Sequence, residues 1–248
     1  MRPVPPSFKP LCALLLAAAC ILSSGCNRIP GRPGPGPEVA RPDQLLDFST
    51  LYKENCTACH GANGRGGASI PLGNPVYVAF AGEDNIGGNI GAGVSGGLMP
   101  PFAQSSGGML TDQQITILAH GIVKTWGNPS VLNGQTPPPY STTLKGDPTH
   151  GQQAFTTFCA RCHGATGTGG PGDATMGKLG SIVQPAYLSL MTDQYLRSII
   201  VAGRPDEGMP DWRTDSTQPL TDQQVTDIVS WLASQRTANP GQPYSSHP

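Results

Sequence analysis

Two short stretches of this 248-residue sequence each place two cysteines and a histidine within five residues and follow them with glycines. The first is ENCTACHGANGRGG at 54–67, and the second is CARCHGATGTGG at 159–170. Closely spaced thiols and an imidazole can bind a metal ion, exchange disulfides or carry a larger group. The question is which chemistry the two stretches share.

The adjacent histidine distinguishes these possibilities. A structural zinc site needs four ligands, which two CxxC pairs could supply jointly, and a thioredoxin-like centre needs a preceding strand. In CxxCH, two thiols form thioethers to a haem and the next imidazole binds its iron. Spacing, order and duplication favour two covalently attached haem c groups, with zinc or disulfide chemistry as the alternatives. The residues concerned are Cys56, Cys59 and His60 in the first motif and Cys159, Cys162 and His163 in the second.

A methionine followed by proline lies downstream of each motif. Met99 stands 39 residues after His60, and Met209 stands 46 residues after His163. A thioether sulfur is a soft ligand that raises the iron potential relative to a second imidazole. The repeat register favours Met99 and Met209 as iron ligands, with nearby Met109 as a competitor and a gap-filling role in the core as the alternative.

The chain contains an internal repeat that positions these residues. The CHGA segment recurs after 103 residues, whereas the Met-Pro and Thr-Asp-Gln-Gln segments recur after 110, so the second copy holds seven extra residues. Each copy predicts a first helix that ends at the cysteine motif, a middle helix and a last helix that starts at a capping box. The middle helix is convincing at 192–203 and weak at its glycine-rich counterpart, 82–93. No alternating strand pattern appears, so the fold class is all-α.

Each half resembles a class I cytochrome c domain, and the pair is similar to tandem two-haem cytochromes c of bacterial electron-transport chains. The resemblance covers 43–127 and 147–238. It implies a few helices and long loops wrapped around one haem in each domain, with a loop methionine as the sixth iron ligand. A large apolar cofactor would also supply a core to a chain that has 33 glycines, 26 prolines and only 6% aromatic residues.

The N-terminus predicts export. Arg2 and Lys9 flank a short polar start, and the apolar run that follows has the length of a signal-peptide core. Small residues then precede Cys26, as in a bacterial lipobox, so Cys26 is the candidate lipidation site. Ordinary cleavage nearby and an uncleaved anchor are the alternatives. The predicted organisation is a signal peptide at 1–25, a Pro/Gly linker at 26–42, domain 1 at 43–127, a linker at 128–146, domain 2 at 147–238 and a tail at 239–248.

These features predict an electron-transfer protein and not an enzyme. With histidine and methionine on each iron, neither iron has an open position for a substrate. The expected location is the periplasm or the outer face of a bacterial membrane, where a membrane-anchored lipoprotein would meet respiratory complexes or small electron carriers. A two-haem peroxidase, a dehydrogenase of small sulfur compounds and a fixed subunit of a respiratory complex are the alternatives. A formal charge of −1 without any basic block argues against nucleic-acid binding.

Overall fold

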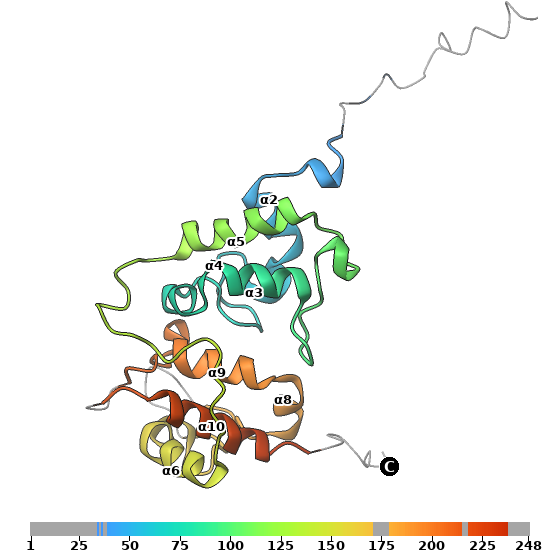
Figure 1. Ribbon diagram of the computed structural model, residues 1–248. Coiled ribbons are helices and arrows are strands. Elements are labelled where there is room, and N and C mark those ends of the chain that lie inside the picture. Colours follow the sequence, from blue (N-terminus) through green and yellow to red (C-terminus); the bar gives the residue numbers. More distant parts are fainter. Residues whose placement is uncertain (1–33, 35, 37–38, 171–178, 215–217, 238–248) are drawn as a thin grey trace, which may run out of the picture. The chain divides into compact units, whose positions relative to one another are not determined.

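The computed structural model describes residues 34, 36, 39–170, 179–214 and 218–237. The predicted signal peptide, Cys26, most of the 26–42 linker and the 239–248 tail lie outside these residues. The described parts of the chain form helices and loops and contain no strand, which confirms the all-α class (Figure 1). Within these parts, no helix has both the length and the apolar character needed to span a bilayer.

The first repeat begins with a helix that leads into the first cysteine motif. The Asp47 carboxylate accepts a hydrogen bond from Thr50 N at 2.8 Å and caps this helix. The last helix begins at Thr111, and Thr111 and Gln114 form the predicted capping box. The elements are η2 (Pro42–Gln44), α2 (Phe48–Asn55), α3 (Thr57–His60), α4 (Pro75–Ala92), η3 (Gln104–Ser106) and α5 (Asp112–Trp126).

The second repeat uses the same devices. Asp147 caps the helix before the second motif, and Pro148 occupies its first turn, where a missing N–H costs nothing. Thr221 and Gln224 form the second predicted capping box. The elements are α6 (Pro148–Phe158), α7 (Ala160–His163), α8 (Pro185–Leu190), α9 (Asp193–Ala202), η4 (Pro205–Glu207) and α10 (Asp222–Ser234).

The middle helices differ from the expectation in one respect. The glycine-rich segment that was predicted to be weak forms the end of α4, because Ile86 and Ile90 are buried there and packing outweighs low propensity. Gly82 has φ 72° and breaks the regular geometry of α4. The corresponding break in the second repeat separates α8 from α9 at Thr192, 110 residues later.

In each repeat, a large side chain on one of the first and last helices packs against a glycine on the other. The large residue lies on the first helix in the first repeat and on the last helix in the second repeat. A Cβ on Gly121 of α5 would lie 2.1 Å from the Phe48 ring of α2. A Cβ on Gly151 of α6 would lie 2.8 Å from the Cβ of Trp231 on α10. By repeat register, Phe48 corresponds to Gly151 and Gly121 corresponds to Trp231. The volume at this crossing is thus supplied by opposite helices in the two halves.

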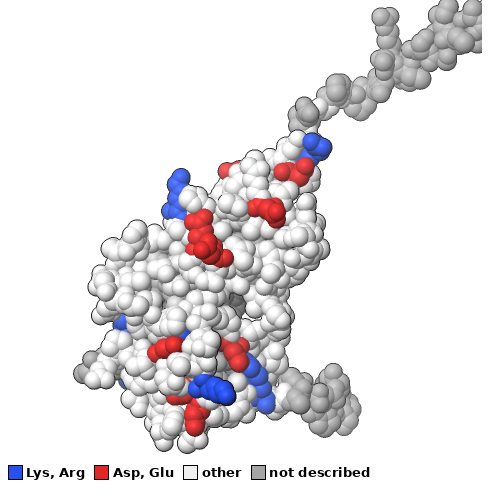
Figure 2. Space-filling view, viewed as in Figure 1, with Lys and Arg blue, Asp and Glu red and all other residues white. Residues whose placement is uncertain are grey.

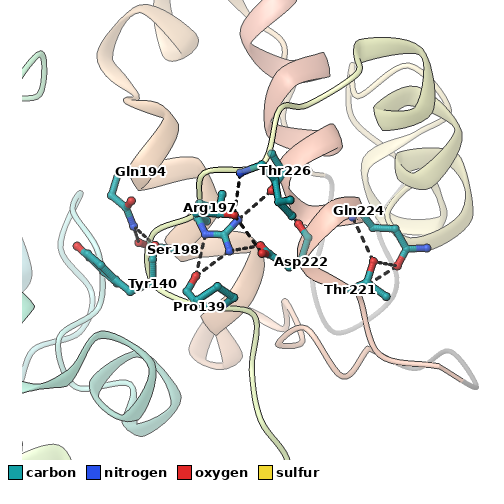
Figure 3. A network of polar contacts seen from close by, with 11 residues as sticks. Pro139, Tyr140, Gln194, Arg197, Ser198, Thr221, Asp222, Gln224 and Thr226 are labelled. Atoms are coloured by element: carbon teal, nitrogen blue, oxygen red, sulfur yellow. Dashed lines mark hydrogen bonds and ion pairs between the residues drawn. The ribbon is translucent and has the colours of Figure 1, made fainter.

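The segment predicted as a linker makes specific contacts. Figure 3 shows the buried Arg197 side chain donating to the Pro139 carbonyl oxygen, with Nε at 2.9 Å and Nη2 at 2.7 Å. Arg197 also pairs with Asp222 and donates to Thr226 Oγ1 at 3.2 Å (Figure 3). This network ties the linker to α9 and α10.

Candidate functional site

Each cysteine motif occupies a short helix directly after the first helix of its repeat. Cys56 N donates to Tyr52 O at 2.9 Å, and Cys159 N donates to Phe155 O at 2.8 Å. Both acceptor residues are buried, and both stand four residues before the first cysteine of their motif. Tyr52 Oη also donates to the Gly61 carbonyl at 3.0 Å, which ties the first motif's loop to α2.

The glycines after each motif allow the chain to fold back onto the motif's own backbone. A Cβ on Gly67 would lie 2.2 Å from the carbonyl oxygen of Cys59. A Cβ on Gly170 would lie 2.2 Å from the carbonyl oxygen of Cys162. No side chain fits at such a separation, so the glycines are explained by this tight return of the loop.

The imidazole of His60 is held in one tautomer. Its Nδ1 lies 2.8 Å from the carbonyl oxygen of Ile70, and since a carbonyl only accepts, Nδ1 carries the proton. Burial lowers the pKa of His60, although the bond to Ile70 offsets part of that shift. The ring is therefore neutral at ordinary pH, with the lone pair of Nε2 available to a metal.

The second motif presents a similar imidazole with different support. Burial lowers the pKa of His163, so this ring is also neutral. Its Nδ1 is buried and has no hydrogen-bond partner among the described residues, as is also true of Arg204 Nε. Buried polar atoms are nearly always partnered. Arg204 Nε, in the segment that leads to Met209, therefore fits a site whose bound group brings polar atoms of its own.

The four motif cysteines are free thiols, and their environment does not suit redox catalysis. Burial raises the pKa of Cys56 to about 11 and that of Cys159 to about 12, with the neighbouring thiol adding to each shift. A reactive dithiol needs a lowered pKa. In the parts of the chain that the structure describes, no three His, Cys, Asp or Glu side chains gather as a metal site. The joint zinc site is thus not formed there.

The two candidate methionines lie in loops that are built alike. Met99 is half-buried against the core, whereas its competitor Met109 is 80% exposed. Met209 is half-buried, and its backbone exchanges two hydrogen bonds with that of Arg204, at 2.9 and 3.0 Å. Residues Leu110 and Leu220, which follow these loops, donate to the carbonyls of Phe102 and Trp212 at 2.7 and 2.8 Å.

A glycine at the start of each loop permits its close return. Gly93 has φ 72°, and a Cβ there would lie 2.7 Å from Pro101 N and 2.8 Å from Met99 O. Gly203 has φ 67°, and a Cβ there would lie 2.5 Å from the carbonyl carbon of Pro210. The methionine loops therefore depend on glycine at these equivalent positions.

Four further tyrosine and histidine residues take packing or surface positions. Tyr77 is buried, while the corresponding Tyr187 is half-buried, and burial raises the pKa of Tyr187 to about 12. His120 is exposed and faces Glu83 at 3.5 Å, and His150 is exposed at the start of α6. Sequence reasoning missed four residues that the structure makes prominent, namely Asn74, Tyr140, Arg197 and Arg204. A tyrosine directly after three prolines inside a linker was an available signal for Tyr140.

Comparisons with known proteins match both repeats to cytochromes. Residues 148–236 match the family described as "Cytochrome c", and residues 43–120 match the family described as "Cytochrome C oxidase, cbb3-type, subunit III". The chain contains two cytochrome c domains in tandem. No curated protein matches its sequence. A chain of the reducing HAO-like protein complex of Kuenenia stuttgartiensis is similar at 16% identity and a TM-score of 0.42, covering 81% of this chain and 100% of that chain.

The two cytochrome c domains carry two covalently attached haem c groups, each with one iron, and their chemistry is haem-based electron transfer. The residues of both motifs fit such a group, because each motif offers two unpaired thiols next to a neutral, half-buried imidazole. When bound, a haem supplies a one-electron couple between Fe(II) and Fe(III). The protein's part is to hold the group and set its surroundings.

Proposed function

We propose that the four cysteines attach the haems and that histidine and methionine bind each iron. Cys56 and Cys59 hold the first haem, with His60 and Met99 as iron ligands. Cys159 and Cys162 hold the second, with His163 and Met209 as iron ligands. The supporting observation is that both domains pair a neutral imidazole with a half-buried methionine in a loop that equivalent glycines keep close.

On this assignment the protein is an electron carrier and not an enzyme. Both iron positions are taken by protein side chains, so a substrate has no free coordination site. Electrons would then enter and leave through the haems, and the protein would tune the two potentials through ligands, burial and hydrogen bonds. The face in Figure 2 carries only scattered positive and negative side chains, in keeping with protein redox partners and without a basic footprint for nucleic acid.

We propose further that the chain works at the outer face of a bacterial membrane. The apolar run before Cys26 supports export, and lipidation of Cys26 would hold both domains next to membrane respiratory complexes. Fractionation of cells that express the protein tests this proposal. The unmodified protein is expected in the membrane fraction and the Cys26→Ala variant in the soluble periplasmic fraction. Recovery of both in the same fraction would contradict lipid anchoring at Cys26.

A second candidate is a permanent subunit of a respiratory complex. It is favoured by the match of residues 43–120 to a family described as subunit III of cbb3-type cytochrome c oxidase. Purification in mild detergent distinguishes the two candidates. A free carrier elutes alone and reduces or oxidises partners on encounter, whereas a subunit co-purifies with other haem proteins in fixed proportion.

The direct test of the carrier assignment is exposure of the reduced holoprotein to carbon monoxide. With methionine on both irons, the optical spectrum should stay low-spin and unchanged by the gas. Carbon monoxide binding by the unmodified protein would show an open iron. That result would favour the enzyme alternatives, a two-haem peroxidase or a dehydrogenase of small sulfur compounds.

A further inference from the structure

Asn74 links the two cytochrome c domains through a buried side chain. Its Nδ2 donates to the carbonyl oxygens of Ala202 and Gly203 at 2.9 and 3.2 Å. These carbonyls stand at the end of α9, where helix geometry leaves acceptors without internal partners. Asn74 is only 1% exposed, so both bonds are shielded from water. Asn74 thus supplies donors to helix-end acceptors of the other domain.

The two segments joined by Asn74 belong to the two haem sites. On the first domain's side, Asn74 lies four residues after Ile70, whose carbonyl orients His60. On the second domain's side, Gly203 is the glycine that starts the Met209 loop. Arg204, the next residue, reaches the Gly67 carbonyl of the first domain at 3.5 Å. The contact therefore connects the loop behind the first motif to the methionine loop of the second.

Tyr140 provides a second connection, from the linker. Its hydroxyl accepts a hydrogen bond from Asn89 Nδ2 at 2.7 Å, and its ring packs on Phe80 with centroids 5.3 Å apart. Its backbone carbonyl accepts from Gln194 Nε2 of the second domain at 2.9 Å (Figure 3). The linker is thus bound on one side to α4 and on the other to α9, where Arg197 also holds Pro139.

We propose that Asn74 is a positioning residue that holds the second domain against the first, so that electrons pass between the two haems within the molecule at one fixed geometry. Tyr140 supports this arrangement through its hydrogen bonds with Asn89 of the first domain and Gln194 of the second. The proposal rests on the electron-transfer function proposed above. It adds that the two haems exchange electrons at a fixed separation and do not act as two independent carriers on a flexible tether. The reason is that the loops that support them are hydrogen-bonded to each other.

The side chain of Asn74 allows a selective test, because its two ends have separate tasks. Its Oδ1 accepts from Val76 N at 2.9 Å and caps α4, while its Nδ2 makes the contact between domains. Asn74→Asp keeps the cap acceptor and places a carboxylate oxygen against two carbonyls. Gln184 caps α8 at the equivalent position of the second domain, where its Oε1 accepts from Tyr187 N of the same domain at 3.0 Å and the residue is exposed. Gln184→Glu is therefore the matched control.

The experiment measures the holoprotein in two ways. Pulsed electron paramagnetic resonance gives the distribution of distances between the two ferric centres, and flash reduction of one haem gives the rate at which the electron equilibrates with the other. Asn74→Asp should lower the docking equilibrium constant of the domains about tenfold, as expected for lost buried hydrogen bonds. A second, broader distance population and slower equilibration should follow, with the Gln184→Glu protein unchanged.

Tyr140→Phe serves as a second variant that touches no helix cap and keeps the ring. It should broaden the distance distribution in the same direction, by less. Distances and rates equal to those of the unmodified protein in both Asn74→Asp and Tyr140→Phe would overturn the proposal, and so would equal effects of Asn74→Asp and Gln184→Glu. Failure of the proposed carrier function would instead appear as carbon monoxide binding in the unmodified protein, whatever the distances.

Discussion

The carbonyl oxygen of Ile70 accepts a hydrogen bond from Nδ1 of His60 at 2.8 Å, whereas His163 has no partner for its Nδ1 among the described residues. A hydrogen bond at the far nitrogen makes an iron-bound imidazole more basic and favours the ferric state. We therefore expect the first haem to have the lower reduction potential. A redox titration in which Met99→Ala and Met209→Ala assign each wave checks the order. The opposite order would show that other surroundings outweigh this bond.

Gly93→Ala should remove methionine ligation in the first domain. A Cβ at Gly93 collides with the backbone at Met99 and Pro101, so the loop must move away. Gly96 also has positive φ, at 70°, but a Cβ there meets nothing within 4 Å. Gly96→Ala is thus the matched control for backbone strain alone. Loss of the methionine-to-iron absorption band in the first variant and its retention in the second is expected. Equal spectra for the two variants would contradict the role of Gly93.

Gly151→Ala should destabilise the second domain. A Cβ on residue 151 would lie 2.0 Å from the carbonyl oxygen of Asp227. Both groups belong to helix backbone, so the clash is relieved only if α6 and α10 move apart. The expected cost is about 1–3 kcal/mol in the free energy of unfolding. Gly88→Ala, on an open face of α4, should instead stabilise by up to about 1 kcal/mol. Urea unfolding of both variants measures the difference, and a loss of stability in both would speak against specific packing at Gly151.

The Arg197–Asp222 pair should respond unequally to removal of its two members. The Arg197 side chain is 5% exposed and that of Asp222 is 28% exposed, so only the carboxylate can turn to water. Asp222→Asn leaves a buried cation without its counter-charge and is expected to cost about 3 kcal/mol. Arg197→Met leaves acceptors that solvent partly reaches and should cost about 1–2 kcal/mol. Denaturant midpoints of the two variants test this ranking, and the reverse ranking would contradict it.

Acid should weaken the second domain partly through Asp147. Hydrogen bonds from the backbone N–H groups of His150 and Thr149 lower the pKa of Asp147 below its ordinary value. A carboxyl with a lowered pKa stabilises the fold above its ordinary value, and this contribution is lost as pH falls through the lowered value. Asp147→Asn should therefore reduce the loss of thermal stability between neutral and strongly acidic pH. An equal loss of thermal stability in Asp147→Asn and in the unmodified protein would contradict this contribution.

Much of this architecture could be predicted because it is encoded locally. The capping boxes at Thr111 and Thr221 depend on residues within one turn, and the structure confirms both of them. The helix over 83–92 was underestimated, since its stability comes from packing of Ile86 and Ile90, which propensity does not contain. The hydrogen bond from Asn74 to Gly203 joins residues 129 positions apart, and no local sequence pattern predicts it.

The exchange of Phe48 and Gly121 for Gly151 and Trp231 is intermediate between the locally encoded caps and the long-range contacts. Each residue is visible in the sequence, and the repeat register aligns them, but the pairing becomes meaningful only when the helices are known to cross there. The site residues remain a proposal of this kind. Their spacing suggests the ligand sets, and the methionine loops and the half-buried imidazoles of His60 and His163 support them.

The measurement that tests the central claim most directly is an optical redox titration of the mature holoprotein beside Met99→Ala, Met209→Ala and the double variant. Two low-spin haems are expected in the unmodified protein, with the methionine-to-iron band reduced by about half in each single variant and absent in the double variant, and with the potential of the altered haem lowered. An unchanged band in either single variant, or a high-spin haem in the unmodified protein, would contradict the assignment of histidine and methionine to both irons.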